Sequence, residues 1–357
     1  MSAFTFSFSG EDIENNNVED TEPQASPFSN HAAEEGTLKR PSSSAFPIAG
    51  QPLLPPQSHN LESMLEMLPS KIAYSTLVVK LDDGKEISIP RRELWDVRVQ
   101  LMAEDDDEGL GNLGKNDVRT GVYEGGFKSW ESSVDVVKVL HARRGEVLGS
   151  AKRALELGCG TALPSLALFQ WLLESVPPSE QSTGGLDLGL ADYNPTVLQL
   201  VTLPNLILTW AQATRKGSWD AEGELELDKE VLQNFLGSLK SYGVTLSFFS
   251  GAWSPEFVHL VVTTMGSGPA RLTIIGAETI YSPTALRSFA DTLVSLLEAM
   301  PEGEKTSLVA AKKVYFGVGG SIEDFYDAVR AKGLYVEQIR EESDGVRRAV
   351  VEVKPKP

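Results

Sequence analysis

The stretch 153–164, with the sequence RALELGCGTALP, constrains the fold of this chain more than any other. Ala154 to Leu157 supplies the apolar residues of a buried strand. Gly158 and Gly160 then allow a tight turn and the close approach of a ligand, because glycine lacks a Cβ atom. Pro164 lies in the first turn of the helix that follows, whose N-terminal amides point back at the turn. A strand, turn and helix of this kind is typical of nucleotide-binding α/β proteins.

The kind of nucleotide follows from what this turn contains. A dinucleotide-binding turn needs a third glycine, and position 163 is leucine. A phosphate-binding loop needs Gly-Lys followed by Ser or Thr, but the pairs at 84–85 and 114–115 are followed by Glu and Asn. The carboxylate of Glu156 would repel a pyrophosphate and attract a cation. We therefore expect S-adenosylmethionine, which carries two cationic groups and no phosphate; a purely structural turn is the alternative.

Composition restricts the compartment and the partners. The 357 residues include no run of about 18 apolar residues, so we expect no membrane span. The N-terminus lacks the pattern of a secretory signal. Cys159 is the single cysteine, which excludes an internal disulfide and suits a reducing compartment. The four histidines are scattered, so we expect no metal site. A formal charge of −18 argues against direct binding to nucleic acid and favours a basic protein partner.

Three regions differ in composition. Residues 1–60 are rich in Ser, Pro, Asn and acidic residues, which predicts a disordered acidic tail. Within this tail, the alternating aromatics of 4–8 are either a short docking motif or an ordinary part of the tail. Residues 61–116 form an N-terminal extension, predicted to contain an amphipathic helix and a hairpin that turns at Asp82–Gly84. Residues 117–357 form the remaining domain.

This last domain alternates strands and helices. Five alternating units are followed by two strands that a hairpin turn joins, which predicts an open, mostly parallel sheet with one antiparallel strand. That arrangement is the seven-stranded, Rossmann-like methyltransferase sheet, an α/β fold, and differs from the six parallel strands of a dehydrogenase. The strands expected after the first are 186–191, 244–249, 272–275, 307–311, 335–340 and 347–353.

Three further residues are candidates for the cofactor site. Asp192 ends the second expected strand, where a carboxylate accepts hydrogen bonds from ribose hydroxyls. Asn194 follows it and can contribute to the same site or cap the next helix. Trp130 stands at the start of a predicted helix, where it lies either over the ligand or in the core.

Motifs spread along the domain resemble those of the histidine protein methyltransferases. These enzymes belong to a wider protein-methylating group with an acidic residue and an aromatic residue after the fourth strand. The resemblance covers about 117–357. The motifs are GVYEGGFKSWE at 121–131, DYN and VTLPN within 192–205, FFSGAWS at 248–254, ETIYSP at 278–283 and YFGVGG at 315–320.

The resemblance implies methyl transfer from S-adenosylmethionine to an imidazole nitrogen of one histidine in a basic large-subunit ribosomal protein. It also implies residence in cytoplasm and nucleus. Glu278 and Tyr281 would face the incoming substrate. One departure is Ala252, where the family often has an acidic residue that would contact the adenine. By motif position, the residues implied to contact the cofactor are Trp130, Gly158, Cys159, Gly160, Asp192, Trp253 and Ala277.

Two other functions compete with this interpretation. A protein of the same fold can methylate lysine, because the motif after the fourth strand is shared. A non-catalytic chaperone that escorts a basic ribosomal protein would also suit the acidic charge. The oligomeric state is left open, with a monomer as the simplest expectation.

Overall fold

The computed structural model describes residues 53–103, 126–148, 152–175, 185–214, 218–266, 268–301, 303–315 and 320–356. Most of the predicted tail, including the aromatics of 4–8, lies outside these ranges. The predicted boundary at 116–117 and parts of two motifs, 121–125 and 316–319, lie outside them as well.

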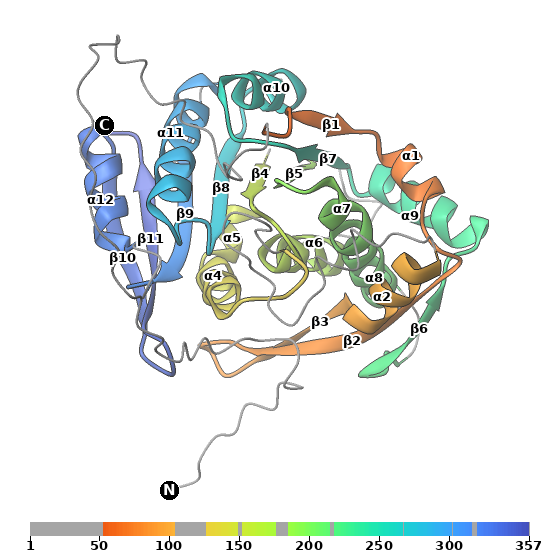
Figure 1. Cartoon of the computed structure of the whole chain (residues 1–357). Helices are drawn as coiled ribbons and strands as arrows, with labels where there is room; N and C mark the ends of the chain where they lie inside the picture. The colour runs from red at the N-terminus through yellow and green to blue at the C-terminus, as the bar shows by residue number, and fades with distance from the viewer. Residues whose placement is uncertain are drawn as a thin grey trace, which may run out of the picture.

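One eight-stranded sheet runs through the molecule in the order β1-β7-β5-β4-β8-β9-β11-β10 (Figure 1). Neighbouring strands from β7 to β9 are parallel, and β11 is antiparallel to both β9 and β10. The predicted methyltransferase sheet is thereby confirmed, with one further strand, β1, at its edge. The strands are β1 (Gln57–His59), β4 (Lys152–Leu157), β5 (Leu186–Asp192), β7 (Val244–Ser250), β8 (Arg271–Ala277), β9 (Lys305–Lys312), β10 (Tyr335–Glu342) and β11 (Arg348–Lys354).

Helices cover both faces of this sheet. Because side chains alternate along a strand, Ala154 of β4 packs into the core on one face, whereas Leu155 and Leu157 pack into the core on the other. No helix among the described residues is long and apolar enough to cross a membrane. On the first face lie α4 (Glu131–Ala142), α6 (Leu163–Ser175), α8 (Leu203–Thr214) and α9 (Lys229–Ser241), and on the second α10 (Pro255–Met265), α11 (Pro283–Ala299) and α12 (Ile322–Ala331).

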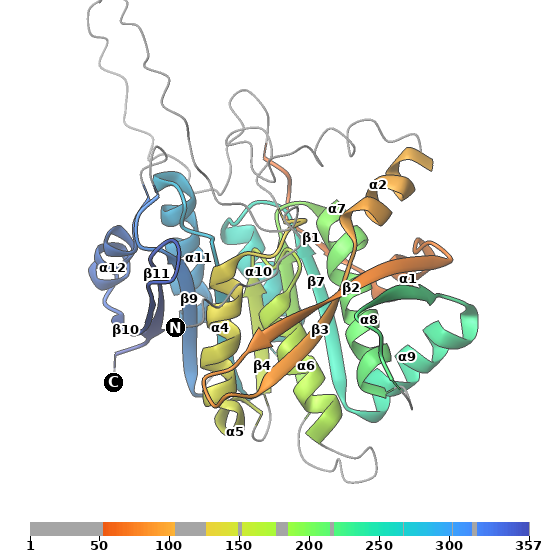
Figure 2. The ribbon, with the colours of Figure 1, turned by 90° about the horizontal axis from the view of Figure 1, so that it is seen from below.

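A second, three-stranded sheet lies outside the helices of the first face. It contains β2 (Lys71–Lys80), β3 (Glu86–Arg92) and β6 (Glu222–Glu226) in the order β3-β2-β6. Figure 2 shows the β2–β3 hairpin lying across α6 and α8. The side chain of Gln170 on α6 donates to the carbonyl of Ser88, at 3.1 Å. On α8, the side-chain oxygen of Asn205 accepts from the backbone N–H of Arg92, at 2.7 Å. The N-terminal extension is therefore part of the main core.

Four elements differ from the predictions. β1 lies within the segment predicted to be a disordered tail, where it pairs with β7 in antiparallel orientation. β6 lies in a stretch for which no strand was predicted, and α10 and α2 (Leu94–Ala103) were not predicted either. β1 and β6 are stabilised by pairing with distant strands, so no local periodicity marks them. The smaller helices are α1 (Leu61–Glu66), α5 (Arg144–Val147) and α7 (Pro195–Val197), the last continuing into a π-helical turn at Leu198–Thr202.

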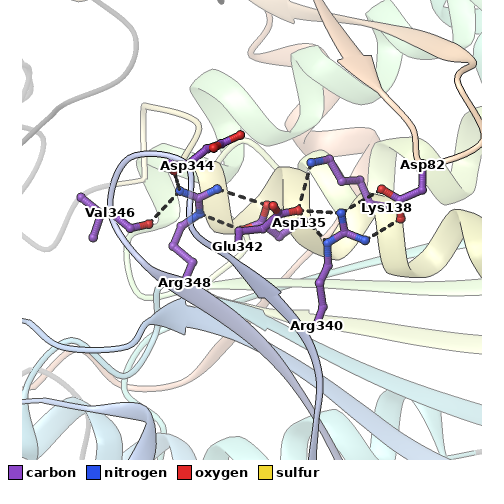
Figure 3. Close-up of polar contacts among 8 residues, drawn as sticks. All are labelled: Asp82, Asp135, Lys138, Arg340, Glu342, Asp344, Val346 and Arg348. Carbon is purple, nitrogen blue, oxygen red and sulfur yellow. Dashed lines mark hydrogen bonds and ion pairs between the residues drawn. The ribbon is translucent and has the colours of Figure 1, made fainter.

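A cluster of charged residues ties helix α4 to the last two strands (Figure 3). Arg348 of β11 donates through Nε to the carboxylate of Asp135 on α4, at 2.7 Å, and both side chains are buried. Arg340 of β10 bonds both carboxylate oxygens of Asp82 in the β2–β3 turn, and Glu342 lies between these pairs and accepts from Arg340. The cluster fixes the position of α4, whose first turn borders the site.

Candidate active site

A pocket opens at the carboxyl ends of β4, β5 and β8. The order of the central strands reverses at this point, which is where open α/β sheets bind their ligands. The structure brings together all but one of the predicted site residues. Those that line the pocket are Trp130, Gly158, Cys159, Gly160, Asp192, Asn194, Trp253, Ala277, Glu278 and Tyr281.

The glycine turn forms one wall of the pocket. Gly158 has φ +67° and Gly160 has φ +50°, a region that favours glycine. A Cβ atom on Gly158 would lie 2.8 Å from the Cγ2 atom of Thr279. A Cβ atom on Gly160 would lie 3.0 Å from the carbonyl oxygen of Gly126. Neither position has room for a side chain.

Asp192 connects the end of β5 to this turn. Its Oδ2 atom accepts from the backbone N–H of Gly160 at 3.1 Å, and its Oδ1 atom accepts from that of Asn194 at 3.0 Å. A carboxylate oxygen can accept more than one hydrogen bond, so these contacts orient the carboxylate without excluding ribose hydroxyls. Asn194 precedes α7, but its side chain makes no capping hydrogen bond.

Glu156 is the predicted cofactor residue that the structure does not bring to the pocket wall. Its side chain is buried, and its Oε2 atom accepts from both the backbone N–H and the hydroxyl of Ser165 at the start of α6, at 3.1 and 2.5 Å. Burial raises the pKa of Glu156 to about 8, so the group is mostly uncharged at neutral pH. The expected attraction between Glu156 and a cationic ligand therefore has no support in this geometry.

Trp253 lies beside Gly158 in the pocket wall, and the N-terminal segment lies behind it. The tryptophan is buried and packs edge-to-face on Phe289, with ring centroids 5.6 Å apart. The backbone N–H of Ala252 donates to the carbonyl of Leu54 at 2.9 Å. Leu54 in turn donates its own N–H to the hydroxyl of Tyr193, at 3.2 Å. The segment that leads into β1 thus supports two residues of the pocket wall, Trp253 and Tyr193.

Glu278 lies at the other end of the pocket, held by two hydroxyl groups. Its Oε1 atom accepts from the hydroxyl of Ser132, and its Oε2 atom accepts from that of Tyr315 at 2.5 Å. Burial raises the pKa of Glu278, while these two donors and the charge of Lys312 lower it. The Nζ atom of Lys312 lies 5.4 Å from the ring centroid of Trp130. Acidic, cationic and aromatic groups therefore meet around Glu278.

Comparison with known proteins identifies the family. No family model matches the chain. Histidine protein methyltransferase 1 of Saccharomyces cerevisiae is 35% identical over 288 residues, which cover 73% of this chain and 75% of that protein. The protein of the same name from Schizosaccharomyces pombe is 36% identical over 275 residues, or 75% of each chain. This chain belongs to the histidine protein methyltransferase family.

Membership in the histidine protein methyltransferases confirms the family and the enzyme class predicted from the motifs, and it supports the predicted cofactor, S-adenosylmethionine. Among solved structures, magnesium protoporphyrin IX methyltransferase from Synechocystis PCC 6803, described with bound SAM, is 12% identical. The superposition of the two structures covers 63% of this chain and 79% of that one, with a TM-score of 0.33. So weak a likeness supports no inference, and the fold is assigned from the strand order itself.

Several residues in or next to the pocket were not among the site residues predicted from the sequence. Tyr315 begins the recognised motif at 315–320 and Ser132 directly follows the one at 121–131, but no local signal connects either residue to Glu278. Thr279 has a buried hydroxyl that has no hydrogen-bond partner among the described residues. The other lining residues that were not predicted are Gly126, Lys128, Ser133, Thr161 and Tyr193.

Proposed function

We propose that this protein transfers a methyl group from S-adenosylmethionine to an imidazole nitrogen of a histidine in a basic large-subunit ribosomal protein. The observation that carries the proposal is a single pocket that joins the glycine turn to the carboxylate of Glu278, in a member of the histidine protein methyltransferase family. We place the activity in the cytoplasm and nucleus, where such substrates are made and assembled.

The pocket has groups that fit each part of the proposed cofactor. Gly158 and Gly160 line the pocket with bare backbone, and Asp192 offers a carboxylate for ribose hydroxyls. Thr279 also lines the pocket, with its methyl group beside Gly158. Lys128 also lines the pocket and is a cation suited to the ligand's carboxylate. Trp253 supplies an apolar aromatic wall, with Ala252 beside it in place of an acid.

Alignment is the main task that this site has to perform. S-adenosylmethionine supplies an electrophilic methyl carbon: the N–C bond forms as the C–S bond breaks, and the electron pair of that bond stays on sulfur. An imidazole has a pKa of about 6.5, so it is mostly an uncharged nucleophile at neutral pH. Holding the reacting atoms about 3–3.5 Å apart can contribute on the order of 7–11 kcal/mol. Glu278 or Tyr281 would hold the N–H of the non-reacting nitrogen, and the imidazolium that forms would be stabilised by the carboxylate.

The choice of histidine over lysine agrees with this arrangement. A lysine ammonium has a pKa of about 10.4 and must lose a proton before it can attack. Glu278 already accepts two hydroxyl hydrogen bonds, which favours its use as an orienting acceptor over use as a strong base. The acidic charge of −18 favours encounter with a basic protein.

Two substitutions separate cofactor binding from turnover. Asp192→Ala should chiefly weaken binding of S-adenosylmethionine, because it removes the proposed ribose acceptor. Glu278→Ala should lower kcat while leaving cofactor affinity nearly unchanged. Asp327→Ala, which removes an exposed carboxylate on α12, is the control. Calorimetry and methyl-transfer rates measure the two effects. Unchanged affinity in Asp192→Ala, or equal loss of binding and turnover in Glu278→Ala, would contradict the assigned roles.

A further inference from the structure

The end of β8 is held in an unusual backbone conformation. Glu278 has φ +57°, a region that a residue with a side chain rarely adopts. Its backbone N–H donates to the carbonyl of Ala310 on β9 at 2.9 Å. Such a conformation persists only where surrounding contacts determine it, and it is common at functional sites. The direction of the Glu278 side chain is therefore imposed by its neighbours.

Two separate elements supply the hydroxyl groups that hold the carboxylate. Ser132 comes from the first turn of α4, and Tyr315 comes from the segment after β9. Tyr315 is itself held, because its hydroxyl oxygen accepts from the backbone N–H of Lys312 at 3.3 Å. Gly320, which follows this segment, lies against the backbone just after Glu278. A Cβ atom on Gly320 would lie 2.5 Å from the carbonyl oxygen of Ile280.

One hydroxyl on each carboxylate oxygen fixes the plane of the group. A carboxylate has about four acceptor sites, so a third donor from the pocket can still bond to Glu278. An imidazole that donates its N–H there is held in one orientation, and its other nitrogen carries the lone pair that attacks. We infer that Tyr315 and Ser132 are positioning residues that fix the Glu278 carboxylate and thereby select which ring nitrogen is methylated. This inference rests on the proposed function.

The charges around Glu278 give a second consequence. The two hydroxyl donors and the positive charge of Lys312 lower the pKa of Glu278, whereas the negative charge of Glu131 raises it. Tyr281 is close enough to Tyr315 to raise the pKa of its hydroxyl. Removal of the Tyr315 hydroxyl takes away a donor that favours the ionised carboxylate. The pKa of Glu278 should then rise, so the acid limb of the pH–kcat profile should move to higher pH.

Tyr315→Phe and Ser132→Ala test the inference, with Tyr326→Phe as a matched control. Tyr326 on α12 has a buried hydroxyl without a hydrogen-bond partner among the described residues. The assay separates the two methylhistidine isomers in the product, records kcat against pH, and measures S-adenosylhomocysteine affinity by calorimetry. Tyr315→Phe should lower kcat about 10- to 100-fold, the effect of one hydrogen bond to a charged group. Tyr315→Phe should also produce both methylhistidine isomers and move the acid limb of the pH–kcat profile to higher pH. Its affinity for S-adenosylhomocysteine should stay within about twofold of wild type.

Ser132→Ala should also give mixed isomers, and it carries the test alone if Tyr315→Phe does not fold. A single isomer and an unshifted acid limb in the folded variants would overturn the inference, whatever the fall in kcat. A wild-type protein that forms no methylhistidine would instead refute the proposed function, so the same assay distinguishes the two failures.

Discussion

At the scale of single residues, the pocket is built from groups that orient one another. Asp192 holds the N–H groups of Gly160 and Asn194, and Thr202 of the π-helical turn donates its hydroxyl to the carbonyl of Gly160 at 2.6 Å. These bonds join the end of β5, the glycine turn and the start of the next helix. The geometry of the turn is therefore set before any ligand binds.

Glu156 gives a pH-dependent prediction for stability. Its pKa of about 8 in the folded protein lies above the usual 4.5, so the folded state holds the proton more tightly. Its contribution is complete at low pH and is lost as the pH rises through about 8. Glu156→Gln cannot ionise, so between about pH 4.5 and 8 it should gain stability relative to wild type by up to about 1.4 kcal/mol per pH unit, and the gain should level off above pH 8. Urea unfolding of both proteins at pH 5.5 and 7.5 measures this, and a constant difference would contradict it.

The sequence predicts the role of a site residue well where the backbone conformation allows only one residue type. Gly158 and Gly160 were predicted from their lack of a Cβ atom, and the structure shows no room for one. The role of Glu156 could not be predicted, because it depends on its burial and on the helix start beside it. Ser132 lies 146 positions before its partner Glu278, and only the docking of α4 against β8 brings the two together.

At the scale of elements, the short strand β1 connects the N-terminal segment to the cofactor pocket. Deletion of residues 1–59 removes β1 and the contacts of Leu54 while keeping Asn60, which caps α1. Deletion of residues 1–52 removes none of these contacts and is the control. The longer deletion should lower the free energy of unfolding by about 1–3 kcal/mol and weaken S-adenosylmethionine binding. Calorimetry and thermal unfolding of both proteins test this. Equal behaviour of the two deletions would mean that β1 does not support the site.

The buried pair Asp135–Arg348 gives a second prediction at this scale. Arg348→Met leaves the carboxylate of Asp135 buried without its charged partner, which typically costs about 3–5 kcal/mol. Arg347→Met removes the neighbouring arginine, whose exposed pair with Glu341 is worth about 0–1 kcal/mol. Urea denaturation should therefore show a large loss for Arg348→Met and almost none for Arg347→Met. Similar losses would show that the pair does not hold α4.

Helices and strands could be predicted where their own residues form an apolar run or a turn signal. The central strands and the β2–β3 hairpin have apolar runs or turn residues of their own, and they lie where expected. β1 is three residues long with mostly exposed side chains, and β6 is largely polar, so both exist because a distant partner strand is available.

At the scale of the whole molecule, the outer sheet and the helices of the first face share one core, and the second face of the main sheet has a core of its own. The first core includes residues of the hairpin and α1 together with those of α4, α6 and α8. The N-terminal extension therefore packs on the same face of the sheet as α6, the helix that follows the glycine turn. The whole chain carries a formal charge of −18, which agrees with the proposed basic protein partner.

Transfer of a labelled methyl group tests this account most directly. The protein is incubated with methyl-labelled S-adenosylmethionine and extract from cells that lack it, and the labelled protein is hydrolysed for amino-acid analysis. Wild type should place the label on histidine of a basic ribosomal protein, and Gly160→Ala should place much less, because alanine is strained at φ +50° and its Cβ atom would lie 3.0 Å from the carbonyl oxygen of Gly126. Label on lysine, no label with wild type, or full activity in Gly160→Ala would contradict the account.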